Sequence, residues 1–188
     1  MFKLIFQSLR MTLIFTVLTG LLYPLAVTGV AQLAFRDKAN GSLIERNGKI
    51  IGSELLAQPF TDAKYFWPRP SACGYATAPS GASNLGPTSA ALQSNVVTNA
   101  KAFRDAHQLA ADAPVPSDIV FTSGSGLDPH ISPEAARLQI IRVAAARGVP
   151  RDAVQALVEK FIELPQLGFL GEPRVNVLLL NLALDQHQ

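Results

Sequence analysis

The hydrophobic and polar positions divide the chain into a short apolar part and a long mixed part. From Met11 to Phe35, 25 consecutive residues include no Asp, Glu, Lys, Arg or His. A helix of this length spans roughly 37 Å, which exceeds the roughly 30 Å hydrocarbon core of a bilayer. A cleaved signal peptide has a shorter apolar region, of only about 7–15 residues. We therefore expect a retained transmembrane helix over residues 11–35, between a short N-terminal leader (1–10) and a single soluble domain (36–188).

Two features of the apolar segment indicate that it packs against other helices. Pro24, near its middle, removes a backbone N–H and favours a kink. The carbonyl that loses its hydrogen bond there needs a donor from a neighbouring helix. Gly20, Thr28 and Gly29 are small, so they allow a partner helix to approach closely. Since one span cannot form a pore by itself, the segment is predicted to anchor the chain in the lipid bilayer beside other helices.

The mixed part opens with a predicted β-hairpin and a long loop. Two strand-like runs between Ser42 and Gly52 flank Asn47-Gly48, the dipeptide favoured in type I′ turns. Residues 57–87 are rich in Pro, Gly, Ser and aromatics, and the stretch is too long for an ordinary connector. It is either disordered or an ordered functional loop. The aromatic run 65–67 favours an ordered loop that packs on the domain or on a partner.

Apolar residues at helical spacing predict the main elements of the domain. One helix is expected over 88–109, with an apolar face made by Leu92, Val96, Ala100, Phe103 and His107. Ser132 followed by Pro133 is typical of a helix start, and Gly148 after Arg147 is typical of a helix end.

Three further segments complete the predicted fold. Val149-Pro150 opens a helix that runs to about Glu163, with Ala153, Leu157 and Phe161 on its inner face. Residues 119–122 are predicted to form a short buried strand, and 175–184 to form a helix in preference to a strand. The fold class is therefore α+β, with one N-terminal transmembrane helix followed by a single helix-rich soluble domain that contains short strands.

The charges argue against a nucleic-acid partner. The 188 residues include 16 Lys and Arg against 14 Asp and Glu, for a net charge of +2. Lys3 and Arg10 precede the apolar segment, so the remaining domain carries 14 basic and 14 acidic residues and is neutral. A neutral domain lacks the basic excess with which proteins neutralise phosphates. A single cysteine, Cys73, also excludes a disulfide framework within the chain.

The strongest candidate for chemistry lies between Thr122 and Gln139. Its Ser123-Gly124-Ser125-Gly126 turn can present successive backbone N–H groups to an anion, and the helix that begins at Pro133 adds the positive end of its dipole. Asp128 opposes this interpretation, because its carboxylate lies between the two features and the loop contains no Lys or Arg. The alternative is a glycine-rich turn that joins a well-capped helix.

Other catalytic or metal-binding patterns are incomplete. His130 has no His or Cys at a metal-ligand spacing, and Gly48-Lys49 is followed by Ile50 where a phosphate-binding loop needs Ser or Thr. Leu127 replaces the last glycine of a nucleophile elbow. We therefore predict no catalytic residues and no metal site. Arg69, between two prolines, is either a solvated loop residue or an anchor to a partner surface.

Several ordered blocks of the chain form a recognisable pattern. They are Tyr65-Phe66-x-x-Arg69-Pro70-Ser71-Ala72, residues 80–88, residues 123–136 continued by Gln139, Arg142-Val-Ala and Ala146-Arg-Gly148, and finally 173–178 with 180–184. Together these blocks resemble the KdpC family, which belongs to the Kdp-type potassium-transporting ATPases, and the resemblance extends over nearly the whole chain. Ala90 replaces a proline that often stands there in this family.

The resemblance implies a single-span accessory subunit of a bacterial inner-membrane complex. Its partners would be a potassium channel-like subunit, a P-type ATPase subunit that hydrolyses ATP, and a very small membrane subunit. Family members are described as catalytic chaperones that raise the affinity of the ATPase subunit for ATP. By this resemblance, Ser123, Gly124, Ser125, Gly126 and Gln139 are the candidate residues for binding ATP.

Two hypotheses remain for the role of the domain. In the first it promotes nucleotide binding by the pump, and in the second it docks on the channel-like subunit without touching nucleotide. They differ in topology, because ATP is a cytoplasmic ligand. Lys3 and Arg10 before the span slightly outweigh Arg36 and Lys38 behind it, since the amino terminus adds its charge, and this favours a cytoplasmic N-terminus with the domain in the periplasm. A free-standing membrane-anchored enzyme is disfavoured for want of a catalytic constellation.

Overall fold

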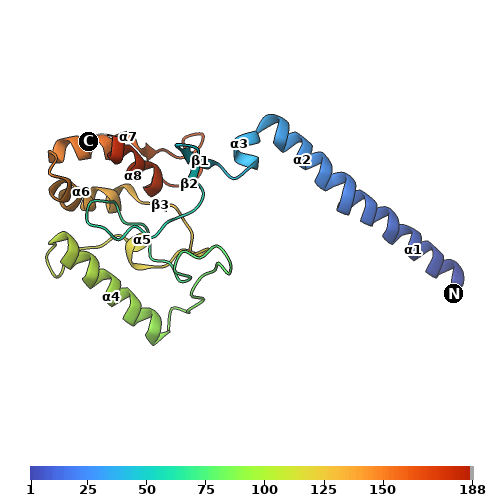
Figure 1. The fold of residues 1–188 in the computed structure, drawn as a ribbon. Helices are drawn as coiled ribbons and strands as arrows, with labels where there is room; N and C mark the ends of the chain where they lie inside the picture. The colour runs from blue at the N-terminus through green and yellow to red at the C-terminus, as the bar shows by residue number, and fades with distance from the viewer. Residues whose placement is uncertain (187–188) are drawn as a thin grey trace. The chain divides into compact units, whose positions relative to one another are not determined.

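The computed structural model describes residues 1–186, which form two compact units (Figure 1). The N-terminal unit comprises Met1–Ser53, and the C-terminal unit begins at Glu54. Each unit has its own architecture. The mixture of helices and short strands after one long apolar helix confirms the predicted fold class.

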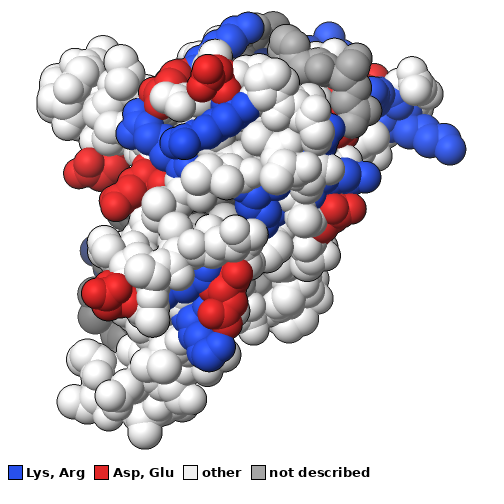
Figure 2. Space-filling model, turned by 90° about the vertical axis from the view of Figure 1, so that its left-hand side faces the viewer, with Lys and Arg blue, Asp and Glu red and all other residues white. Residues whose placement is uncertain are grey.

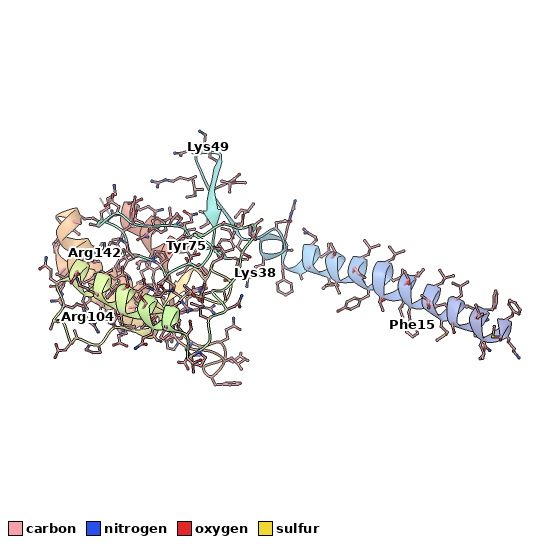
Figure 3. All side chains as sticks on the ribbon, turned by 90° about the horizontal axis from the view of Figure 1, so that it is seen from below. Phe15, Lys38, Lys49, Tyr75, Arg104 and Arg142 are labelled. Atoms are coloured by element: carbon pink, nitrogen blue, oxygen red, sulfur yellow. The ribbon has the colours of Figure 1, made fainter. Side chains whose placement is uncertain are left out.

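The N-terminal unit is dominated by one continuous helix. It consists of α1 (Phe2–Val17), a π-helical turn (Leu18–Leu22) and α2 (Tyr23–Ala34). Over its 33 residues the helix is long and apolar enough to cross a membrane, as the sequence predicts, and none of its most apolar window is buried inside the protein. Phe15 projects outward from it in Figure 3. The helix begins at Phe2, so the leader residues are part of it.

The π-helical turn accommodates the proline in the middle of this helix. Pro24 has no N–H to donate, and the ring of a proline crowds the carbonyl four residues earlier, here that of Gly20. In the turn before it, the N–H of Tyr23 donates to the carbonyl of Leu18, five residues back instead of four. A π-helical turn is wider than an α-helical one and relieves this kind of crowding. Proline therefore changes the hydrogen-bonding pattern without ending the helix.

The predicted hairpin is confirmed at the end of this unit. After the short helix α3 (Arg36–Ala39), strand β1 (Leu43–Arg46) pairs antiparallel with β2 (Lys49–Ser53), and a bulge interrupts the register. The two turn residues Asn47 and Gly48 have φ values of 53° and 73°, as a type I′ turn requires. Lys49 lies at the tip of the hairpin in Figure 3.

Helices on two sides enclose the core of the C-terminal unit. In Figure 1, α6 (Pro133–Arg147), α7 (Arg151–Lys160) and α8 (Val177–Gln186) gather on one side, and α4 (Ala90–His107) lies on the other. Helix α6 contacts both α4 and α7, so it is the central helix of the unit. The predicted bounds and cap of α6 are confirmed, because Ser132 accepts a hydrogen bond from the N–H of Ala135 and Gly148 adopts a left-handed conformation.

A small antiparallel sheet and an ordered loop fill the space between the helices. Strand β5 (Arg174–Asn176) is central and pairs with β3 (His130–Ile131) and β4 (Ile162–Glu163). The long loop after Glu54 is ordered, and its Phe66 is completely buried in the core. Of the two alternatives for this loop, disorder or an ordered loop, the structure shows the ordered one. The loop, strand β5 and the helices α4, α6, α7 and α8 all contribute side chains to the core. They include Phe66, Phe103, Ile140, Val143, Val158, Val175 and Leu180.

Three sequence predictions need correction. Residues 119–122 do not form a strand: α5 (Ser117–Val120) is a single helical turn that follows Pro116, although Ile119 and Val120 are buried as expected. Helix α7 ends at Lys160 because Ile162 pairs with β5. Its buried face is Val154, Leu157 and Val158, whereas Ala153 is exposed.

The C-terminal apolar run, residues 175–184, contains both a strand and a helix, the two structures considered for it. Val175 and Asn176 belong to strand β5, and the chain enters helix α8 at Val177. The favoured helix is therefore confirmed for most of the run.

Charged side chains of opposite sign are interspersed on the surface. Arg137 donates to both carboxylate oxygens of Glu159 across α6 and α7, at 2.7 and 2.9 Å. On α4, Lys101 pairs with Asp105 one turn later. Figure 2 shows the two signs side by side on one face of the molecule.

Candidate functional site

The Ser123–Pro129 loop joins α5 to β3, and three hydrogen bonds form within it. The hydroxyl of Ser123, which is almost fully buried, accepts the N–H of Asp128 at 3.4 Å. The hydroxyl of Ser125 accepts the N–H of Leu127 at 3.0 Å, and the N–H of Gly126 donates to the carbonyl of Ser123. Three backbone N–H groups therefore hold the loop in shape, and one of them, that of Gly126, belongs to the turn that the sequence offered to an anion.

Gly126 lets this loop approach the aromatic-rich loop closely. Its φ is 71°, and a Cβ placed there would lie 2.5 Å from the Sγ of Cys73 and 3.0 Å from the carbonyl oxygen of Gly81. The hydroxyl of Ser71 also donates to the carbonyl of Gly126 at 2.7 Å. Gly124 differs, because no atom of the described residues lies within 4 Å of a Cβ built there. Gly126 is thus required by packing, and Gly124 faces open space.

Asp128 is the electrostatic centre of the loop. Arg69 donates to it at 2.8 Å, and His130 donates its backbone N–H at 3.0 Å and places its ring Nδ1 at 3.3 Å. Burial by itself raises the pKa of Asp128, but the hydrogen bonds from His130 and Arg69 outweigh it and lower the pKa to about 2. Arg69 therefore pairs within the chain, and its side chain stays partly exposed. Its Nε atom is buried and has no hydrogen-bond partner among residues 1–186.

An open hollow of about 380 Å³ lies over this loop. Ser123, Gly124 and Ser125 line it together with Arg69 and Asp128, and Leu55 and Leu56 form an apolar wall. Three of the five predicted nucleotide residues thus line this hollow together with an arginine that the spacing of the loop did not reveal, whereas Gly126 packs behind the lining.

The start of helix α6 already holds a carboxylate. Asp118, on α5, accepts the backbone N–H of Ser132 at 2.6 Å and its hydroxyl at 3.1 Å. A carboxylate in this position uses the favourable end of the helix dipole that a phosphate would use. The role of Asp118 was not predicted, because the residues directly after it, 119–122, were expected to form a strand.

The fifth candidate residue, Gln139, lies in the core. Its side chain is completely buried, and its amide binds both backbone groups of Trp67: Oε1 accepts the N–H at 2.7 Å and Nε2 donates to the carbonyl at 3.2 Å. Asn181 on α8 binds the N–H and carbonyl of Phe66 in the same way, at 2.8 and 3.0 Å. Two helices therefore fix two consecutive residues of the loop. In the sequence, both contacts could have been predicted from a side-chain amide that stands on an otherwise apolar face of a helix.

Arg142 completes the attachment of the aromatic loop. It lies over the ring of Trp67 at 4.1 Å, donates to Oε1 of Gln139 at 2.9 Å, and donates to the carbonyl of Ala63 at 2.6 Å. Its Nε donates to Nε2 of His107 on α4 at 2.9 Å, so this ring nitrogen is unprotonated. Burial, and to a smaller extent the charge of Arg142, lower the pKa of His107 to about 4 against the opposing effect of its bond to the Phe103 carbonyl.

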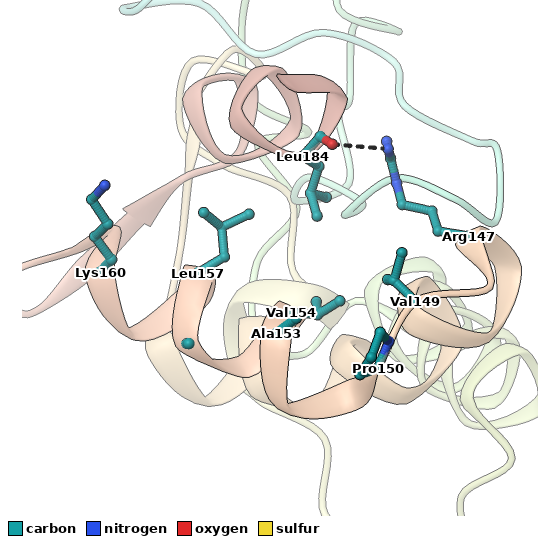
Figure 4. A pocket seen from close by; sticks show the side chains of 9 residues that line it. Arg147, Val149, Pro150, Ala153, Val154, Leu157, Lys160 and Leu184 are labelled. Carbon is teal, nitrogen blue, oxygen red and sulfur yellow. Dashed lines mark hydrogen bonds between the residues drawn. The ribbon is translucent and has the colours of Figure 1, made fainter. Parts of the chain in front are cut away.

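A second hollow, of about 440 Å³, is apolar and lies between α7 and α8 (Figure 4). Val149, Pro150 and Leu157 line its middle, with Arg147 and Lys160 at its ends. The Arg147 guanidinium donates to the carbonyl of Leu184 and to Asp185, so it is engaged within the chain. Within residues 1–186, no three His, Cys, Asp or Glu side chains are placed to hold a metal ion.

Comparison with known proteins identifies one family. The family model described as "KdpC: K+-transporting ATPase, c chain" matches residues 5–186. The chain is 52% identical over 181 residues to the potassium-transporting ATPase KdpC subunit of Methylococcus capsulatus, with 95% of each chain covered. It is 54% identical over 181 residues to the subunit of the same name from Mycobacterium tuberculosis, covering 95% of this chain and 96% of that one. For Geobacter sulfurreducens the identity is 53% over 182 residues, with 95% of each covered.

Proposed function

Because the chain belongs to the KdpC family of K⁺-transporting ATPases, we propose that it is a non-catalytic accessory subunit whose C-terminal unit docks on its partner subunits. The partners would be the channel-like, ATP-hydrolysing and small membrane subunits of a bacterial inner-membrane complex. The long apolar helix would anchor the chain beside them, with its N-terminus in the cytoplasm and its C-terminal unit in the periplasm.

One observation supports the docking role: the groups that could bind a nucleotide are already engaged by other groups of the chain. Three N–H groups of the Ser123–Pro129 loop bind within the loop, Asp118 occupies the start of α6, and Gln139 is buried against Trp67. A phosphate near Asp128 would also meet a carboxylate that stays charged down to a pH of about 2. A unit whose polar groups are engaged internally in this way is suited to present surfaces to partners.

The second candidate function is an increase in the affinity of the complex for ATP. The hollow over the loop favours it, because Arg69 lines the space and keeps one buried Nε–H without a partner in the described part of the chain. Under this alternative, Ser123, Gly124 and Ser125 would contact ATP directly. Gln139 and Gly126 would not touch ATP but would support the residues that do, since Gln139 is fully buried and Gly126 packs on Cys73.

Gly124 offers the experiment that separates the two functions. A Cβ at this position meets no described atom of the protein within 4 Å, so Gly124→Val should leave the fold intact while filling part of the hollow. Docking predicts that complexes containing this variant keep the wild-type KM for ATP and the wild-type potassium-stimulated ATPase activity. A rise in KM of about tenfold or more, with assembly unchanged, would favour the nucleotide function.

A further inference from the structure

The connection between β4 and β5 exposes a cluster of large apolar side chains. We call residues 164–170 the apolar tip. The exposed fractions are 77% for Leu164, 82% for Leu167, 74% for Phe169 and 50% for Leu170. No charged residue interrupts the chain from Leu164 to Gly171. Single exposed apolar residues are ordinary, but a cluster of this kind marks a binding surface.

The backbone of the apolar tip is held in one conformation. Gln166 and Leu170 exchange two backbone hydrogen bonds, of 3.0 and 2.9 Å, and the N–H of Gly168 donates to the carbonyl of Pro165. Leu167 and Gly168 both have positive φ, of 54° and 82°. A positive φ is unfavourable for leucine. The Leu167 side chain gains no compensating burial within the described part of the C-terminal unit. The turn is thus preorganised, which reduces the entropy lost when a partner binds.

The charges at the base of the tip indicate the kind of partner. Glu163 pairs with Arg174 across β4 and β5 at 2.9 Å, and Glu172 is exposed. The residues that directly flank the tip, Glu163 and 171–174, therefore carry two acidic groups and one basic group, and the pairing of Glu163 with Arg174 leaves Glu172 as the excess charge. Apolar segments that insert into bilayers are usually accompanied by unpaired Lys or Arg, because biological membranes carry anionic lipids. An apolar cavity of a protein with a basic group at its rim complements this tip better.

We infer that the apolar tip is a docking element that inserts into an apolar, basic-rimmed cavity of another protein subunit of the ATPase complex. The inference rests on the proposed function, because it assumes that the chain assembles with such subunits. Leu167 and Phe169 are the anchors, since they combine high exposure with a fixed backbone. Large side chains that become buried at the centre of an interface contribute most of its binding energy.

Retention in the assembled complex tests the inference. The full-length chain is co-expressed with its partner subunits as wild type, Leu167→Asn with Phe169→Asn, or the control Val97→Asn, which changes a 62% exposed residue of α4. We expect the tip variant to dissociate during size exclusion in detergent, with about a tenfold or greater loss of the bound fraction. The control should remain bound. Circular dichroism of each isolated full-length chain checks that the fold is unchanged.

Photocrosslinking identifies the partner. With p-benzoylphenylalanine in place of Leu167, the intact complex in native membranes should give a crosslink to one other subunit. Equal retention of the tip variant and wild type, or crosslinks to lipid alone, would overturn the inference and leave the accessory role standing. If the wild-type chain itself fails to co-purify with the other subunits, the proposed function fails as well.

Discussion

At the scale of single residues, buried amides and one buried histidine decide how the aromatic loop is held. Gln139 and Asn181 each satisfy both backbone groups of one loop residue, so they replace the ladder that a neighbouring strand would provide. Burying a backbone N–H and carbonyl without partners is costly, and these amides remove that cost. The residue that the family resemblance assigns to nucleotide thus has a structural role that explains its buried position.

Replacing Gln139 by leucine should destabilise the protein strongly. Gln139→Leu leaves the N–H and carbonyl of the half-buried Trp67 without partners and removes an acceptor from Arg142, so we expect a loss of about 2–4 kcal/mol. Urea unfolding of the full-length chain in detergent micelles measures it. The control Gln155→Leu, at an exposed position of α7, should change stability by less than about 0.5 kcal/mol. Equal stability of the two variants would contradict the structural role of Gln139.

The buried His107 makes stability depend on pH. Its pKa is about 4 in the folded state against 6.5 as the ordinary value, so the unfolded chain binds a proton that the folded one excludes. The stabilisation is therefore complete above pH 6.5 and is lost as the pH falls toward 4. We expect a loss of about 2 kcal/mol between about pH 7 and pH 5 in urea unfolding. His107→Gln should reduce this pH dependence, and an unchanged slope would show that other groups cause it.

At the scale of elements, the apolar helix is shaped by its own residues and leaves its surface free for partners. The π-helical turn absorbs Pro24, and the small residues that the sequence singles out remain unobstructed. A Cβ at Gly20 would touch only Thr16, at 4.0 Å, and one at Gly29 would touch no atom of residues 1–186. Any effect of a larger side chain at these positions therefore reports on a neighbouring helix.

Gly20→Leu or Gly29→Leu should weaken assembly in the membrane. A bulky side chain keeps two packed helices apart, so less of the variant should co-purify with the partner subunits after detergent extraction. Val30→Leu, at a 64% exposed position of the same helix, is the control and adds only one methylene group. Full co-purification of both glycine variants would exclude close helix packing at these positions.

At the scale of the whole molecule, the side of the membrane that holds the C-terminal unit limits its function. The charges around the apolar helix favour a cytoplasmic N-terminus only slightly. If the unit is periplasmic, ATP does not reach it in the cell, and any influence on the ATPase subunit must pass through contacts. If it is cytoplasmic, the hollow beside Arg69 gains importance.

Thiol labelling of intact inner membranes decides the orientation. Cys73 is half-buried beside Gly126, so the reporter is Lys160→Cys in a Cys73→Ser background, because Lys160 is exposed at the end of α7. In osmotically opened cells, a reagent that cannot cross the inner membrane should label this cysteine. Labelling only after the inner membrane is lysed would reverse the orientation and make the nucleotide function the first candidate.

Local patterns in the sequence were sufficient for the apolar helix, the Asn47-Gly48 hairpin and the capped helix α6. In each case the signal lies within the element: an uncharged run long enough for a bilayer, a dipeptide that accepts two positive φ values, and a serine and a glycine at the two ends of a helix. Neighbouring residues along the chain impose these structures, so distant contacts were not needed to predict them.

Only the tertiary structure decided the conformation of residues 117–122 and the surroundings of the candidate site. Asp118 turns toward Ser132, Arg69 reaches Asp128 across 59 positions of sequence, and Gln139 meets Trp67 across 72. A short apolar run is compatible with strand or helix, and the contact that stabilises one of them lies on another element. The sequence therefore determined which segments form and which residues are candidates. Packing between distant segments decided which polar groups are already satisfied and which surfaces, such as the apolar tip, remain for a partner.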